Sequence, residues 1–284
     1  MINLIEASRG IQKSGGICVY TMHLREFSER SSTILMVHKA RKNGLSFWNK
    51  DRPSDADHLI VAFEAYHQLS QVSIKPMTEI SSMADMHTTR SDFKYVNRRV
   101  LENAPCSVGI LVDRGLGGTS HISASNVSYS ITVLFFGGSD DREALAYGAR
   151  MAEHPGIRLV VLRFVVKPST TGDIVRVDVG ESSFSTKLIS EDEEFLNEFK
   201  AKVANDDFVT YEEKAVKDAA ETVAVICEFT HCNLVLVGRR PQGELAYALK
   251  RNEYPELGPI GSLLVSQDCP TIASVLVMQQ YQNQ

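Results

Sequence analysis

A chain of 284 residues is long enough for two domains at the usual ~150 residues each. Its composition, 43% hydrophobic and 23% charged, is typical of a globular protein, and its net charge of −5 argues against a nucleic-acid surface or an anionic-lipid surface, where clustered Lys and Arg are expected. No apolar run approaches the ~20 residues of a membrane-spanning helix, so we predict that this chain does not itself insert into a membrane.

The cysteines and the first residues indicate a reducing compartment. The cysteines are odd in number and widely spaced, which fits free thiols better than a disulfide framework. Residues 1–6 lack the basic stretch and apolar core of a signal peptide, so exposure to the cytosol is expected. The five cysteines are Cys18, Cys106, Cys227, Cys232 and Cys269.

The first half of the chain predicts short helices and strands in alternation. Helices are expected at 4–12, 59–69 and 91–103, and strands at 17–24, 72–78 and 106–112. Residues 32–39 fit a strand or a helix, and 41–57 read as an exposed loop around the only tryptophan, Trp48. Glycines and serines between 113 and 126 are typical of a linker.

The second half opens with a β-strand, an α-helix and a second strand. An apolar run at 131–136 is closed by Gly137-Gly138 and predicts a buried strand followed by a tight turn. Asp140-x-x-Glu143 has the form of a helix start, with Ser139 as an alternative N-cap. Pro155-Gly156 ends that helix, and 157–166 supplies the next strand. The unit predicts a parallel sheet with helices on both faces, which is an α/β fold.

The remaining elements continue this alternation. Residues 168–194 are polar and end in an acidic run, Glu191 to Glu194, which is expected to be a solvated helix start or a flexible loop. Helices are predicted at 194–203, from about 215 to 227, and at 260–265. Strands are predicted at 208–211, 234–237 and 274–278, the last of them at a sheet edge.

The two halves resemble each other, which predicts a tandem duplication of one α/β module. Helix 91–103, Pro105 and a strand parallel helix 260–265, Pro270 and a strand. We therefore expect a first module at 1–114, a linker at 115–128 and a complete second module at 129–284. The first module lacks an opening strand and a helix–strand near residue 87, so its sheet is expected to expose edges.

Several strings resemble the C-terminal cytosolic region of plant CHX-type cation/proton exchangers. They are Leu-Phe-Phe-Gly-Gly-Ser-Asp-Asp-Arg-Glu-Ala-Leu-Ala-Tyr-Gly at 134–148, together with residues 28–38, 98–109 and 255–262. The resemblance implies two Rossmann-like modules of the universal-stress-protein type, which follow a membrane antiporter domain in that family. That membrane part is absent from this chain.

The function that the resemblance implies is regulation of a cation (potassium)/proton antiporter, in monovalent cation transport and pH homeostasis. The resemblance also implies that the chain lies on the cytosolic face of an endomembrane or the plasma membrane. Its implied partner is the membrane antiporter domain, and a homodimer is a further expectation. The alternatives are a nucleotide-binding stress-type module acting alone and a plain interaction scaffold.

A nucleotide or anion site is the sharpest site hypothesis. Universal stress proteins that hold ATP use two closely spaced glycines and then Gly-Ser, so that backbone amides cradle phosphates at a helix N-terminus. Here the glycine spacing departs from that motif, and Asp140 and Asp141 would repel a phosphate. We therefore expect the glycines to serve turns and caps, with a nucleotide as the alternative. The candidate residues are Gly238, Arg239, Arg240, Gly243, Gly261 and Ser262.

Catalysis and metal binding find less support. The sequence has no Gly-x-Ser-x-Gly elbow, Walker loop or His-Glu-x-x-His pair, so we predict no enzyme, no resident cofactor and no metal. Cys227 and Cys232, with His231, resemble a ligand cluster but are expected to be buried structural cysteines. His23 and His38 lie in or beside apolar segments, where a histidine could sense pH or simply hold an ordinary hydrogen bond.

Overall fold

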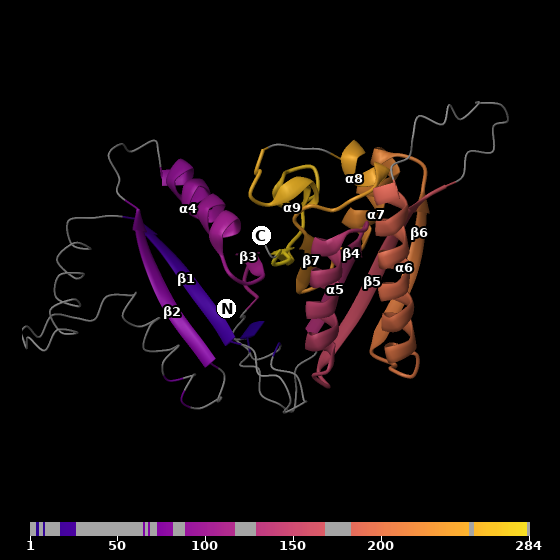
Figure 1. Ribbon diagram of the computed structural model, residues 1–284, viewed down its shortest axis with the longest axis horizontal. Coiled ribbons are helices and arrows are strands. Elements are labelled where there is room, and N and C mark those ends of the chain that lie inside the picture. Colours follow the sequence, from indigo (N-terminus) through magenta and orange to yellow (C-terminus); the bar gives the residue numbers. More distant parts are fainter. Residues whose placement is uncertain are drawn as a thin grey trace, which may run out of the picture. The chain divides into compact units, whose positions relative to one another are not determined.

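The computed structural model in Figure 1 describes residues 4, 5, 8, 18–26, 65, 68, 73–81, 89–116, 129–167, 183–249 and 253–282. The chain divides into two compact units. The smaller unit spans 12–102, and the larger unit spans 103–284 together with 3–11.

The smaller unit contains two long strands and a helix. Strand β1 (Cys18–Glu26) pairs in parallel with β2 (Ser73–Ser81), and helix α4 (Thr89–Asn103) follows. These elements confirm the strands predicted at 17–24 and 72–78 and the helix predicted at 91–103. The predictions for 32–39 and 41–57 lie outside the described residues, as do most residues of the helices predicted at 4–12 and 59–69.

The larger unit is built on one six-stranded sheet. The strands lie in the order β3-β8-β7-β4-β5-β6, and every neighbouring pair is parallel except β3 and β8, which are antiparallel. Their bounds are β3 (Val108–Val112), β4 (Tyr129–Phe135), β5 (Ile157–Val166), β6 (Val209–Val216), β7 (Leu234–Gly238) and β8 (Ser274–Gln279).

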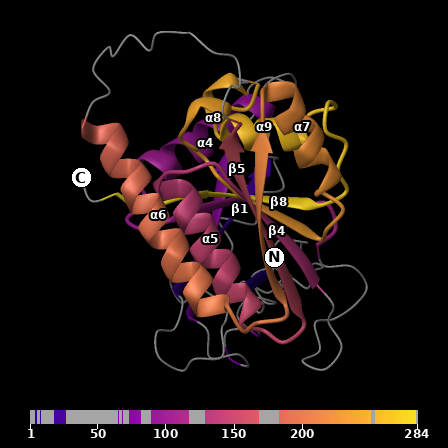
Figure 2. The ribbon, with the colours of Figure 1, turned by 90° about the vertical axis from the view of Figure 1, so that its right-hand side faces the viewer.

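Helices cover both faces of this sheet, as the predicted α/β fold requires. One face packs against α5 (Ser139–Ala152) and α6 (Ser183–Val203), which lie side by side in Figure 2. The other face packs against α7 (Ala219–Glu228), α8 (Glu244–Ala248) and α9 (Gly258–Val265).

The central strands are mostly apolar because both of their faces are buried. On β4, Val133 packs toward α5 and α6, whereas Leu134 packs toward α7 and α9, and both side chains are fully buried. Gly148 lets α5 approach the sheet closely, since a Cβ there would lie 2.9 Å from Val133 Cγ2 and 3.1 Å from Leu236 Cδ1. Helix α5 therefore packs closely on the sheet at Gly148.

The last strand does not lie at a sheet edge, so that expectation was wrong. Strand β8 is paired on one side with β7 and on the other with β3, in a register that places Val108 opposite Gln279 and Val112 opposite Val275. Residues 108–112, which the sequence analysis assigns to the first module, thus complete the sheet of the second. The division of the chain at 114 and 128 stays a prediction. A homodimer also stays a prediction, and it can no longer be argued from a last strand that lies at a sheet edge.

Two further boundaries differ from expectation. Helix α6 begins at Ser183 rather than near 194, so the acidic run lies inside a helix. Strand β6 runs to Val216 because it pairs with β5 along its whole length, and Ala215 therefore belongs to a strand. Helix α7 begins only after Asp218, whose side chain caps it by accepting from the Glu221 amide.

Candidate functional site

The chain reverses its direction across the sheet between β4 and β7. From β4 it crosses through α5 to β5 on one side, and from β7 it crosses to β8 on the other. In open α/β sheets, ligands bind in the crevice outside the carboxyl ends of the strands at such a switch point. The residues at this place are 136–142, which follow β4, and 238–243, which end and follow β7.

Two glycines form the turn between β4 and α5. Gly137 and Gly138 have φ of 130° and 95°, the left-handed region that favours glycine. The N-cap of α5 is Gly138, which has no side chain to form a capping hydrogen bond. The expectation of a cap at Ser139 or Asp140 was therefore wrong. The turn is also held by the segment that follows β7, where the Gln242 amide donates to the Gly137 carbonyl at 2.9 Å.

The Asp141 carboxylate binds the ends of both central strands. Its Oδ2 accepts from the amides of Phe136 (2.7 Å) and Gly137 (2.9 Å), and its Oδ1 accepts from the Gly238 amide at 2.9 Å. The residue is only 1% exposed. Backbone amides at a turn before a helix are the donors that a bound phosphate would use, and here a side chain occupies them.

Gly238 is required at the end of β7 because the start of α5 lies directly against it. An added Cβ would stand 2.6 Å from the Asp141 amide nitrogen and 2.7 Å from the Asp140 carbonyl carbon. Both atoms belong to the backbone and cannot move aside as a flexible side chain would. The glycine therefore permits the close contact that lets Asp141 reach β7.

Asp140 binds the segments that follow β7 and β8. Its Oδ2 accepts from the backbone amide and from Nε of Arg240, both at 3.1 Å, and its Oδ1 accepts from the Gln280 amide at 2.9 Å. Asp140 is 1% exposed, whereas the Arg240 side chain is about half exposed at 51%. The two adjacent aspartates together fasten the carboxyl ends of three neighbouring strands.

Burial raises the pKa of the Asp141 carboxyl from its ordinary 3.8 to about 7. The three amide hydrogen bonds stabilise the charged form and oppose this rise, whereas the negative charge of Asp140 adds to it. Two arginines near Asp141 are paired with other carboxylates. Arg240 contacts Asp140, and Arg142 of α5 contacts Asp192 (2.5 Å) and Glu191 (3.1 Å) of α6.

We expected the acidic run of α6 to be a solvated helix start or a flexible loop, and its contacts show that this expectation was wrong. Asp192 accepts from the Gly138 amide at 2.9 Å in addition to its pairing with Arg142, and Glu193 pairs with Arg163 of β5. The sequence analysis missed these contacts because the arginines that hold the run lie 50 and 30 residues away.

The structure brings together only some of the six predicted site residues. Gly238, Arg239 and Arg240 follow one another at the end of β7, and Gly243, with φ of 103°, caps the short helix α8. The Arg239 guanidinium donates to the Glu256 carbonyl at 3.2 Å and to Gln279 Oε1 at 2.8 Å, so it is held by the chain itself.

Gly261 and Ser262 lie inside α9 and take part in packing. A Cβ on Gly261 would stand 2.8 Å from Val277 Cγ2, which shows how closely this helix approaches β8. The buried Ser262 hydroxyl donates to the Tyr254 carbonyl at 2.9 Å. The residues thus have structural contacts of their own, and nucleotide binding stays a prediction.

Two of the cysteines are paired, which corrects the expectation of free thiols throughout. Cys227 and Cys269 form a disulfide whose Cα atoms lie 5.6 Å apart, within the ordinary range. Cys232 is separate, and its thiol donates to the Leu234 carbonyl at 3.3 Å.

Among the described residues, no three His, Cys, Asp or Glu side chains gather as a metal site would require. Of the two histidines considered for pH sensing, His23 lies in β1 but its side chain is not described, and His38 lies outside the described residues.

Two protein-family models match parts of this chain. Residues 128–279 match the family model of the plant cation/H(+) antiporter C-terminal domain, and residues 19–89 and 88–116 match a second plant cation/H(+) antiporter domain. The chain therefore belongs to the plant cation/H(+) antiporter family, which confirms the resemblance seen in its sequence.

Two Arabidopsis thaliana relatives show the extent of the match. Cation/H(+) antiporter 18 is 54% identical over 99% of this chain, and Cation/H(+) antiporter 17 is 47% identical over 99%. The chain spans only 39% and 40% of the length of these relatives. Within the residues that the structure describes, no helix combines the length and apolarity needed to cross a membrane.

Solved structures of universal stress proteins overlap with the chain in part. UspA from Lactobacillus plantarum is 13% identical with a TM-score of 0.35, over 55% of this chain and 100% of that protein. A universal stress protein from Archaeoglobus fulgidus is 13% identical with a TM-score of 0.37, over 92% of this chain and 96% of that one.

Proposed function

We propose that this chain is a non-catalytic, cytosolic regulatory region of a monovalent cation/proton antiporter, and that it responds to the proton concentration through Asp141. Membership of the plant cation/H(+) antiporter family supports the association with a membrane antiporter domain. The observation that carries the regulatory part is a fully buried carboxyl that holds the ends of β4 and β7.

The response follows from the difference between the buried and the hydrated carboxyl. When the end of β7 separates from α5, Asp141 becomes hydrated and its pKa returns from about 7 toward 3.8. The closed site therefore binds a proton that the open site releases. Between these two values, opening becomes easier by up to about tenfold for each unit that the pH rises, and it levels off above about 7.

The groups facing Asp141 support a response at this one position. Asp140 is paired with Arg240 on the β7 side, and Asp192 is paired with Arg142 on the α6 side. Asp141 itself faces backbone amides and has no cationic partner among its hydrogen bonds. A change of cytosolic pH across neutrality would thus alter the net charge at the centre of the switch point. We propose that the antiporter's membrane domain detects the resulting loosening.

The same geometry argues against the two alternative functions. A nucleotide phosphate would have to displace the Asp141 carboxyl from the amides of Phe136, Gly137 and Gly238, and it would meet the negative charge of Asp140 beside it. A plain scaffold requires no titrating group inside its sheet. A domain that responds to protons accounts both for the backbone amides that are already occupied and for the buried titrating carboxyl of Asp141.

The test measures opening of the site against pH. Amide hydrogen exchange at Gly137 and Gly238, corrected for intrinsic rates, is compared at pH values from about 5 to about 8, on both sides of the Asp141 pKa of about 7. We expect protection to fall as the pH rises toward 7 and then to level off. Asp141→Asn should remove this dependence, whereas Asp207→Asn, at an exposed position, should keep it. Equal profiles in Asp141→Asn and the wild type would contradict the proposal.

The regulatory role needs a second measurement on a whole antiporter that carries this region. Cation/proton exchange is followed against the pH on the cytosolic side, with the same two variants. Asp141→Asn is expected to flatten or displace the pH profile at equal protein abundance, and Asp207→Asn to leave it unchanged. A profile that is identical in all three proteins would overturn the regulatory role, even if the hydrogen-exchange result stood.

A further inference from the structure

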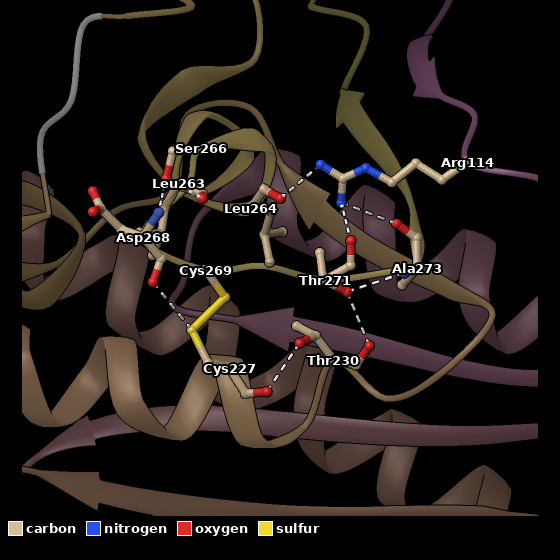
Figure 3. The surroundings of a disulfide bond; sticks show 10 residues. All are labelled: Arg114, Cys227, Thr230, Leu263, Leu264, Ser266, Asp268, Cys269, Thr271 and Ala273. Carbon is tan, nitrogen blue, oxygen red and sulfur yellow. Dashed lines mark hydrogen bonds between the residues drawn. A yellow bond between two sulfur atoms is a disulfide. The ribbon is translucent and has the colours of Figure 1, made fainter.

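The loop between α9 and β8, residues 266–273, is fastened on two sides. On one side, the fully buried Cys269 is joined by a disulfide to Cys227, a partly exposed residue in the last turn of α7 (Figure 3). The bond closes a separation of 42 residues in the chain. It therefore links a helix on one face of the sheet to the segment that leads directly into β8.

On the other side, the loop is held by the residues that follow β3. Arg114 Nη1 donates to the carbonyls of Thr271 (2.9 Å) and Ala273 (3.3 Å), and its Nη2 donates to the Leu264 carbonyl at 3.2 Å (Figure 3). The Arg114 amide donates to the Ser274 hydroxyl at 2.9 Å. One arginine thus binds both ends of the loop and connects them to the end of β3.

A chain of hydrogen bonds joins these two attachments. The Thr230 hydroxyl donates to the Cys227 carbonyl, and the Thr271 hydroxyl donates to the Thr230 carbonyl, both at 3.0 Å (Figure 3). Thr271 in turn receives Arg114 on its carbonyl. A continuous set of bonded residues therefore runs from the disulfide to the end of β3.

We propose that Cys227 and Cys269 are a reversible thiol–disulfide switch that sets how firmly β3 is held on β8. Strand β3 lies at the edge of the sheet that the described residues form, where it pairs with β8, so it depends on the position of β8 and of the loop before it. Only residues 104–107 separate β3 from α4, which belongs mostly to the smaller unit. The switch therefore acts on the strand that follows one of the places where the chain passes from one unit to the other.

The chemistry is an exchange with a dithiol reductant of the thioredoxin class. One thiolate of the reductant attacks Cys227 Sγ, the more accessible sulfur, and Cys269 leaves as a thiolate that takes a proton. The second thiol of the reductant then attacks the mixed disulfide and releases Cys227. The protein gains two thiols and the reductant becomes a disulfide; oxidation runs the same exchange in reverse. In a reducing compartment, disulfides of this kind are transient and regulatory.

The test follows the redox state and the strand in the same samples. The chain is equilibrated in buffers that range from oxidised to reduced dithiothreitol, and differential alkylation with mass spectrometry reports the bond between Cys227 and Cys269. We expect the bond to form and break reversibly. In the reduced state, amide exchange should rise about tenfold or more at residues 108–112, but not at 157–166.

Two variants make the result specific. Cys227→Ser should show the fast exchange at β3 in oxidising buffer as well, and it is preferred to Cys269→Ser because position 227 is partly exposed. Cys232→Ser should behave as the wild type, since Cys232 takes no part in the bond. Failure of the bond to form in oxidising buffer, or equal exchange at 108–112 in both redox states, would overturn the proposal.

Discussion

Asp140 and Asp141 are neighbours in the chain, yet each carboxylate binds a different pair of segments. Asp141 holds the ends of β4 and β7, and Asp140 holds the residues that follow β7 and β8. Two side chains attached to α5 therefore supply the negative charge that a bound anion would otherwise bring to these amides. Because the chain itself bonds these amides, we propose that this site opens and closes rather than holding a ligand.

The sequence analysis identified this place but not its chemistry. It predicted the turn at Gly137-Gly138, which the structure confirms, and it inferred from the charges of Asp140 and Asp141 that they oppose a phosphate, which stays a prediction. It interpreted the aspartates as ordinary helix-start residues, since their partners at Gly238, Arg240 and Gln280 lie about a hundred residues or more away. No local pattern reports such pairings.

The close approach of Gly238 to α5 can be tested by one methyl group. Gly238→Ala places a Cβ 2.6 Å from the Asp141 amide nitrogen, so either the helix start must move or the bond to Asp141 must break. We expect the free energy of unfolding, measured by urea titration, to fall by about 2–3 kcal/mol, the usual cost of overpacking with loss of a buried hydrogen bond.

Gly115→Ala is the matched control for this substitution. An added Cβ there meets nothing within 4 Å, and only the positive φ of 97° opposes the change. Its cost should be about 1 kcal/mol from backbone strain alone. Equal losses in the two variants would mean that α5 does not lie against β7 as closely as described.

Asp192 is one of two acidic residues of α6 that bind the start of α5. Asp192 accepts from the Gly138 amide and pairs with Arg142, and its side chain is only 13% exposed. Asp192→Ala leaves that amide and guanidinium without this partner, so we predict a loss of about 2 kcal/mol in the free energy of unfolding.

The acidic run offers its own control two residues further along α6. Glu194 is exposed, and Glu194→Ala should change the free energy of unfolding by no more than about 0.5 kcal/mol. Thermal and urea denaturation of both variants measure the difference. If Asp192→Ala were as stable as Glu194→Ala, the run would be the solvated helix face that its composition alone predicts.

The accuracy of the predicted elements follows the burial of each segment. Strands β4, β5 and β7 are mostly apolar, and their predicted positions were confirmed to within about two residues. The first turns of α6 and most of β6 were missed because their sequences are polar. Strand β6 lies at the edge of the sheet with an alternating, half-exposed pattern, so no continuous apolar run identifies it.

At the scale of the whole molecule, the pairing of β3 with β8 is the feature that sequence reasoning missed. The apolar run at 106–112 was recognised as a strand, but an apolar run carries no information about its neighbour in the sheet. The repeat of helix, proline and strand in the two halves suggested that each strand closed its own module. The structure instead places both strands next to each other in one sheet, where each covers an edge of the other.

A titration with ATP and AMP tests what the chain as a whole can bind. Binding at a nucleotide concentration about 100 times Kd would raise the free energy of unfolding by ~2.7 kcal/mol, which a thermal-shift measurement detects readily. We expect no shift, because Asp140 and Asp141 occupy the amides at the switch point and the Arg239 guanidinium is bonded to Glu256 and Gln279. A shift that disappeared in Arg240→Ala and in Gly261→Asp would instead establish the nucleotide site among the six predicted residues. A shift that both variants kept would indicate binding elsewhere and leave the closed switch point as described.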